Sequence, residues 1–114
     1  MKIKMPRGDR RDLKFSIKDR SGEIISTDFD EIYFSCKKGF NNPEVLFQKK
    51  LSDGTITKDE NSIYHLAIIP TDTDNLRYGN YVFDIELVIE NSLKQTTVGE
   101  LLLTNEVTHA RNEV

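Results

Sequence analysis

The chain has 114 residues, with 37% hydrophobic and 31% charged side chains, a composition typical of one globular domain with a modest core. Sixteen basic and 19 acidic residues give a net charge of −3, and there is no tryptophan and one cysteine. A single thiol excludes an intrachain disulfide, and no apolar run approaches the about 20 residues that a membrane-spanning helix needs.

The positive charge gathers at the start of the chain. Residues 1–14 carry six basic and two acidic side chains, a local charge of +4 that leaves −7 on the remaining 100 residues. This asymmetry is typical of a segment that docks on an acidic partner, or of a solvated arm that keeps an edge strand soluble. We expect residues 1–11 to form a basic arm, with Arg10 and Arg11 as candidate contact residues. No apolar signal-peptide segment follows the first charges, so we expect the protein to be made and folded in a cytoplasm.

Short alternating segments, separated by turn residues about every ten positions, predict an all-β protein. Asp53-Gly54 favours a tight two-residue hairpin, because this pair tolerates the positive φ angles of such turns. Pro70–Asn75 predicts a helical turn with Thr71 or Asp72 as N-cap. We expect residues 105–114 to be a short tail or a last strand. The predicted strands are residues 12–18, 23–26, 31–38, 45–51, 55–58, 63–69, 81–89 and 93–103.

The segment from Gly79 onward is typical of immunoglobulin-like domains. After the corner between two strands, these domains place a tyrosine near the start of the next strand and a core residue two positions on. Gly79, Tyr81 and Phe83 fit this spacing. The sequence therefore predicts a single domain, residues 1–114, folded as an immunoglobulin-like antiparallel β-sandwich of about seven strands, with a small barrel as the alternative.

Strand phase also predicts the core. We expect Phe83, Ile85 and Leu87 to face Ile32 and Phe34 across the sandwich. Three residues of the first predicted strand should lie near them. They are Leu13, Phe15 and Ile17.

No residue pattern indicates catalysis. His65 is out of phase with its apolar neighbours and should lie on a polar face, while Cys36 shares the inward phase and should be a buried, unreactive thiol. Asp72-Thr73-Asp74 begins like a calcium-binding loop, but Arg77 and Phe83 stand where that loop needs glycine and glutamate. The glycines are scattered singly, so the sequence has no glycine-rich loop of the kind that binds phosphate. No basic strand carries interleaved aromatics, the pattern typical of nucleic-acid binding. We expect no enzymatic activity, cofactor, metal or nucleic acid, and no small-molecule ligand.

Tyrosines offer candidate contact residues of another kind. Tyr33, Tyr64 and Tyr78 can present amphipathic rings at solvent-facing or corner positions, and tyrosine is enriched in the cores of protein interfaces. They can equally cover the sandwich edges or make corner hydrogen bonds.

Four groups of residues along the chain form one further pattern: Gly8-Asp9 with Leu13-Lys14-Phe15, Asp30–Phe34, Leu46–Lys50 with Asp53-Gly54, and the stretch from Pro70 to Asp84-Ile85-Glu86. Together they resemble small phage and prophage proteins of Gram-positive bacteria, with a similarity that runs from about Gly8 to Val107. More distantly, the predicted shape resembles the N-terminal immunoglobulin-like domain of phage baseplate upper proteins.

The resemblance implies a structural module of a virion tail or baseplate that packs against other phage proteins. The hypothesis is therefore a non-enzymatic protein that acts through contacts with phage structural proteins or with further copies of itself. A carbohydrate-binding adhesion module is the alternative, since aromatic side chains beside polar groups bind sugars.

Overall fold

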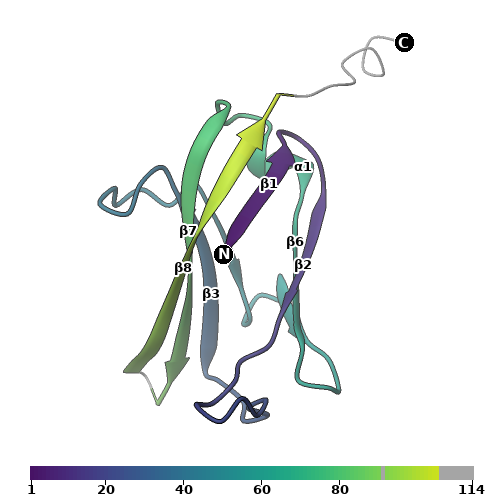
Figure 1. Cartoon of the computed structure of the whole chain (residues 1–114), viewed down its shortest axis with the longest axis vertical. Helices are drawn as coiled ribbons and strands as arrows, with labels where there is room; N and C mark the ends of the chain where they lie inside the picture. The colour runs from purple at the N-terminus through teal and green to yellow at the C-terminus, as the bar shows by residue number, and fades with distance from the viewer. Residues whose placement is uncertain (91, 106–114) are drawn as a thin grey trace.

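The computed structural model describes residues 1–90 and 92–105, of which 92–95 are described by their backbone only. It contains eight strands and one helical turn (Figure 1). These elements are β1 (Lys2–Pro6), β2 (Arg11–Phe15), β3 (Glu31–Lys37), β4 (Phe47–Lys50), β5 (Ile56–Lys58), β6 (Tyr64–Ile68), α1 (Pro70–Thr73), β7 (Gly79–Ile89) and β8 (Ser92–Thr104).

The strands form two sheets packed as a sandwich. One sheet has the order β1-β8-β7-β3-β4, and the other has the order β2-β6-β5. Without β1, this is the immunoglobulin arrangement, with strands B, E and D in one layer and G, F, C and C′ in the other. The predicted immunoglobulin-like β-sandwich is therefore confirmed, with eight strands among the described residues instead of about seven.

The prediction of a solvated N-terminal arm over residues 1–11 was wrong. Lys2–Pro6 is a strand that pairs in parallel with Glu100–Thr104 of β8, so the first sheet is mixed and not purely antiparallel. Ile3 and Met5 are buried at 4% and 2% exposure, while Lys2 and Lys4 point to solvent. The alternation of lysine with apolar residues is that of an edge strand, on which exposed lysines discourage aggregation.

Two further predictions are corrected around the turns. Residues 23–26 form no strand, and only an isolated bridge joins Lys18 to Ile24. The Asp53-Gly54 turn is not a hairpin, because β4 pairs with β3 while β5 pairs with β6 in the opposite sheet. Gly54 has the expected positive φ of 83°, so the residue pair identified the reversal but not the sheet that the returning strand joins.

The helical turn α1 lies where it was expected, at the crossing between the sheets, but its N-cap is Ile69 and not Thr71 or Asp72. Pro70 occupies the first helical position, which needs no backbone N–H. The Asp72 carboxylate accepts a hydrogen bond from the Ile69 backbone N–H at 2.8 Å. No helix in residues 1–90 or 92–105 is long and apolar enough to cross a membrane.

The core lies between the two layers, and Phe83 is at its centre with 1% exposure. Its ring stacks on Phe34 with 4.9 Å between centroids. A side chain at Gly99 would come within 2.5 Å of the Phe83 ring, so glycine is needed there for β8 to pass over it.

The expected placement of the β7 residues across the sandwich from β3 was wrong. β3 and β7 are neighbours in one sheet, with Phe34 beside Ile85 and Ile32 beside Leu87. The opposite layer supplies Phe15 and Tyr64, whose rings stack at 5.3 Å. The alternation of apolar and polar residues along each strand correctly predicted which side chains point inward. This alternation alone does not show whether two strands are neighbours in one sheet or lie opposite each other in the two sheets.

Tyr81 forms the corner contact that its spacing predicted. Its hydroxyl donates to the Arg77 carbonyl at 2.7 Å, and the residue is 4% exposed. We expect Tyr81→Phe to lower the free energy of unfolding by about 1 kcal/mol, because a partly buried hydrogen bond to the Arg77 carbonyl is lost. Urea denaturation measures this loss, and Tyr78→Phe, at a residue that is 43% exposed, is the control. Equal effects from both variants would contradict a special role for Tyr81.

Candidate contact surface

The chain leaving β1 is held against the corner that precedes β7. The Arg7 guanidinium lies 4.4 Å from the centroid of the Tyr78 ring and donates to the Leu76 carbonyl at 3.3 Å. The Gly8 N–H donates to the hydroxyl of Thr73, a fully buried residue, at 2.8 Å. These contacts fix the path by which the chain passes from one sheet to the other.

Arg10 and Arg11 follow this contact and are both exposed. Arg10 pairs with Asp12 at 2.9 Å, with both side chains more than half exposed. Arg11 donates to the Lys4 carbonyl at 3.3 Å and thereby connects the edge strands β2 and β1. Arg11 on β2 and the lysines of β1 therefore lie on two edge strands on one side of the sandwich, and Arg10 directly precedes β2 (Figure 1).

The three candidate tyrosines do not form one surface. Tyr33 lies half-buried on the outer face of the larger sheet, and Tyr78 lies at the corner under the Arg7 guanidinium. Tyr64 is fully buried, so its assignment to a contact surface was wrong. Its side chain points inward, as those of Leu66 and Ile68 do. Stacking its ring on Phe15 buries more apolar area than an exposed position of the ring would.

His65 lies on the polar outer face of the smaller sheet, as its phase predicted. Its ring nitrogen Nε2 lies 2.8 Å from Oδ2 of Asp59, and the side chain is 45% exposed. The contact with His65 and backbone N–H donors lower the pKa of Asp59. Because the other Asp59 oxygen accepts from the Asn61 and Ile63 N–H groups, this carboxylate holds the turn between β5 and β6.

Cys36 is fully buried, as predicted. Burial, with a smaller contribution from Asp72, raises the pKa of its thiol to about 12, so the nucleophilic thiolate is disfavoured near neutral pH. Over residues 1–90 and 92–105, no group of three or more histidine, cysteine, aspartate and glutamate side chains could hold a metal ion.

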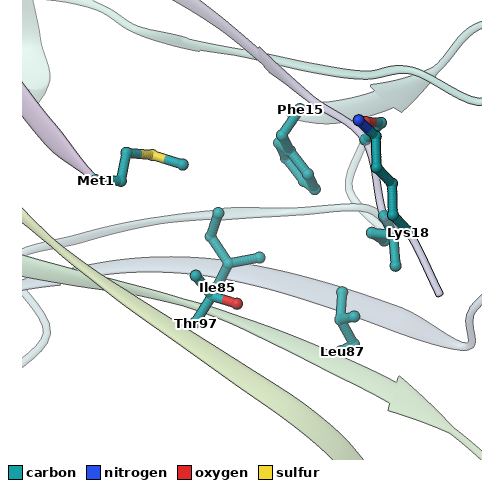
Figure 2. A pocket seen from close by; sticks show the side chains of 8 residues that line it. Met1, Phe15, Lys18, Ile85, Leu87 and Thr97 are labelled. Carbon is teal, nitrogen blue, oxygen red and sulfur yellow. The ribbon is translucent and has the colours of Figure 1, made fainter. Parts of the chain in front are cut away.

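Sequence reasoning missed an opening between the two sheets, shown in Figure 2. It has a volume of about 130 Å³ and lies below the point where β1 begins. Phe15 enters it from β2, and Ile85 and Leu87 enter it from β7. The sequence contains one signal of this opening. The positions of β8 that point inward are leucine at 103 and 101 but threonine at 97.

Asp84 lies half-buried on the outer face of β7, and its Oδ1 has no hydrogen-bond partner among the described residues. Burial raises the pKa of this carboxyl, and Lys37 offsets part of the effect. A raised folded-state pKa means that the charged form costs stability at neutral pH, and that this cost disappears as the pH falls below the unfolded value.

We therefore expect Asp84→Asn to raise the melting temperature at pH 7, by an amount that shrinks as the pH falls towards 3.8, the ordinary pKa of the carboxyl. Circular dichroism melts across this pH range measure the difference from the parent protein. Glu60→Gln, in an exposed turn, is the control. A gain that persists unchanged at low pH would contradict the explanation.

No protein-family model matches the chain, and no curated protein matches it. Among solved structures, that of a proposed glycoside hydrolase from Bacteroides vulgatus has a TM-score of 0.44 and 14% sequence identity to this chain. The match covers 95% of this chain but only 17% of the length of that protein. A likeness this weak carries no argument about function.

Proposed function

We propose that the protein is a non-enzymatic, phage-derived interaction module that acts through protein contacts in a virion tail or baseplate. The observation that supports the contact role is the basic side of the molecule. Lys2, Lys4, Arg10, Arg11 and Lys14 are all exposed, and all but Arg10 belong to the edge strands β1 and β2. Charges held at fixed positions steer association and set register with an oppositely charged partner.

The phage assignment is supported by the sequence resemblance that runs from about Gly8 to Val107. In this proposal the protein is made in the cytoplasm of the bacterial host and is then incorporated into the particle. Its partners are other phage structural proteins or further copies of itself.

The carbohydrate-binding alternative has less support. It depended on Tyr33, Tyr64 and Tyr78 as an aromatic platform. Tyr33 lies on the outer face of the larger sheet, Tyr64 in the core, and Tyr78 at the corner before β7. A sugar site needs aromatic and polar groups that converge on one concave surface. These three tyrosines do not supply one.

The test is incorporation into particles. Cells carrying the prophage are induced, particles are purified, and mass spectrometry measures the protein relative to a major tail protein. We expect the parent protein to be present, and the double variant Arg10→Glu with Arg11→Glu to be depleted about tenfold or more, as loss of electrostatic complementarity predicts. Lys50→Glu, on β4 at the opposite edge of the larger sheet, should be retained. Absence of the parent protein from purified particles would overturn the proposal.

A further inference from the structure

The opening between the two sheets exists because β1 covers only part of this side of the sandwich. β1 pairs with Glu100–Thr104 of β8, and no other described strand lies beside the part of β8 from Ser92 to Gly99 on that side. Figure 1 shows the N-terminus at mid-height of the molecule, with β1 beside the upper half of β8. Below that point the inward-facing Thr97 is exposed, so the apolar interior is accessible from the side.

The opening is apolar inside and polar at its rim. Ile85 and Leu87 line it and are only 7% and 6% exposed. Figure 2 shows the Phe15 ring on one side of the space and these two aliphatic side chains on the other. Thr97 and Lys18 also line it, and both are exposed. A ligand that matches this lining has an apolar part inside and a polar part at the rim.

A second, narrower space adjoins the opening on its core side. The opening has a volume of about 130 Å³ and the narrower space a volume of about 40 Å³. Met1, Phe15 and Ile85 line both, and the narrower space also contacts Phe34 and Leu66. For scale, a cavity of roughly 150 Å³ holds the six carbons of benzene. The two spaces together therefore hold about six carbon atoms, and the narrow inner part favours an unbranched chain over a ring.

The charge at the rim is positive. Lys18 lines the opening, and no described aspartate or glutamate lines either space. Among the described residues, no ion pair includes Lys18. The neighbouring Asp19 carboxylate is occupied, since it accepts hydrogen bonds from two backbone N–H groups of its own turn. Lys14 contacts the narrower space, but in β2 it pairs in register with the outward-facing His65. Lys18 is therefore the cation that an anionic group at the rim would meet.

We propose that the opening binds a small anionic amphiphile, an unbranched carboxylic acid of about seven carbons. The alkyl chain passes between Phe15 and Leu87 towards Phe34, and the carboxylate lies at the rim beside Lys18. Burial of the methylenes supplies most of the affinity, and a charge-assisted hydrogen bond with the lysine sets the orientation. This site goes beyond the proposed contact role, and it opposes the sequence-based expectation that no small molecule binds.

Other occupants match the lining less well. A cationic amphiphile would bring like charge to Lys18, and like charges at close range oppose association. A sugar would place hydroxyl groups against Phe15, Ile85 and Leu87, where they would lose their hydrogen bonds to water without replacement. An uncharged aliphatic group would fill the space but would leave the lysine unused.

The probes are straight-chain carboxylates from butanoate to decanoate, titrated into the purified full chain and followed by NMR. Each methylene that enters the apolar space should tighten binding about fourfold, up to a chain of about seven carbons. Longer chains should gain less than about twofold per methylene, because the added carbons remain in water. The methyl signals of Ile85 and Leu87 should shift, while those of Leu103, near the other end of β8, should not. Straight-chain amines of the same lengths are the control ligands, and should bind at least about tenfold more weakly.

Variants of the chain locate the two parts of the ligand. Thr97→Phe fills the opening from an exposed position and should weaken heptanoate binding about tenfold or more, whereas Thr97→Ser should bind like the parent. Lys18→Met keeps the stem of the side chain but removes its charge, and should reduce the preference for carboxylate over amine about tenfold. Lys18→Arg should restore the preference. Lys50→Met, on β4 at the opposite edge of the larger sheet, should leave it unchanged.

Chain-length-dependent binding that shifts Ile85 and Leu87 and is lost in Thr97→Phe supports the proposal. No binding, equal binding of the amines, affinity that does not depend on chain length, or binding that Thr97→Phe retains would overturn it. Should Thr97→Phe fold poorly, the charge variant decides, because a carboxylate preference that Lys18→Met leaves intact also overturns the site. These measurements use purified protein, so absence from phage particles would refute the virion assignment and leave this test unaffected.

Discussion

Replacing Phe83 by alanine is expected to lower the free energy of unfolding by about 3–5 kcal/mol, the usual cost of removing a buried aromatic ring. The ring is 1% exposed, stacks on Phe34 and lies directly under Gly99, so the surrounding backbone has little room to close the cavity. Small domains are stable by about 5–15 kcal/mol, so the loss is a large share of the total.

Urea denaturation followed by circular dichroism measures this change. The matched control is Phe40→Ala, which deletes the same ring at a position that is 57% exposed, and should leave the midpoint almost unchanged. Similar midpoints for the two variants would contradict the central placement of Phe83 in the core.

The second large effect is expected at the ion pair between Lys49 and Asp72. Their charged groups lie 2.7 Å apart, with side-chain exposures of 8% and 13%, and they join β4 to the helical turn α1. Lys49→Met keeps most of the side-chain stem but leaves the carboxylate without its cation, and should cost about 3 kcal/mol or more. The double variant with Asp72→Asn should recover part of this loss, because the uncompensated charge is then gone.

A double-mutant cycle, measured by urea denaturation, isolates the coupling between the two side chains. Lys58→Met is the control, since Lys58 pairs with an Asp28 side chain that is 93% exposed, and such pairs contribute about 0–1 kcal/mol. A loss at Lys49 no larger than the loss at Lys58 would contradict the importance of the buried pair.

The parts of the fold that were predicted correctly depend on local spacing. Gly79, Tyr81 and Phe83 identified the corner and the inward face of β7 because turn chemistry and strand phase involve only neighbouring residues. The same reasoning missed β1, whose charges suggested a solvated arm. Its alternation of Lys2, Ile3, Lys4 and Met5 is also that of an edge strand, and burial of the two apolar side chains decided the outcome.

Local spacing also explains why the exposure of only some candidate contact residues was predicted correctly. Arg10 and Arg11 are exposed, as expected for arginines beside turn residues, whereas Tyr64 follows the inward phase of its strand and is buried. The change from leucine to threonine at position 97 is visible in the sequence, but the opening itself depends on where β1 begins along β8. That boundary is set by pairing between segments about 100 residues apart, which no local pattern specifies.

The open edge of β8 is tested most directly by amide hydrogen exchange of the free protein, resolved by residue with NMR. An open edge predicts alternating protection along β8, with fast exchange at Thr96 and Val98 and slow exchange at Thr97 and Gly99, whose N–H groups bond to β7. Uniform slow exchange from 96 to 99 would show that the outer edge of β8 is covered there, and would contradict a sheet in which β1 pairs only with Glu100–Thr104.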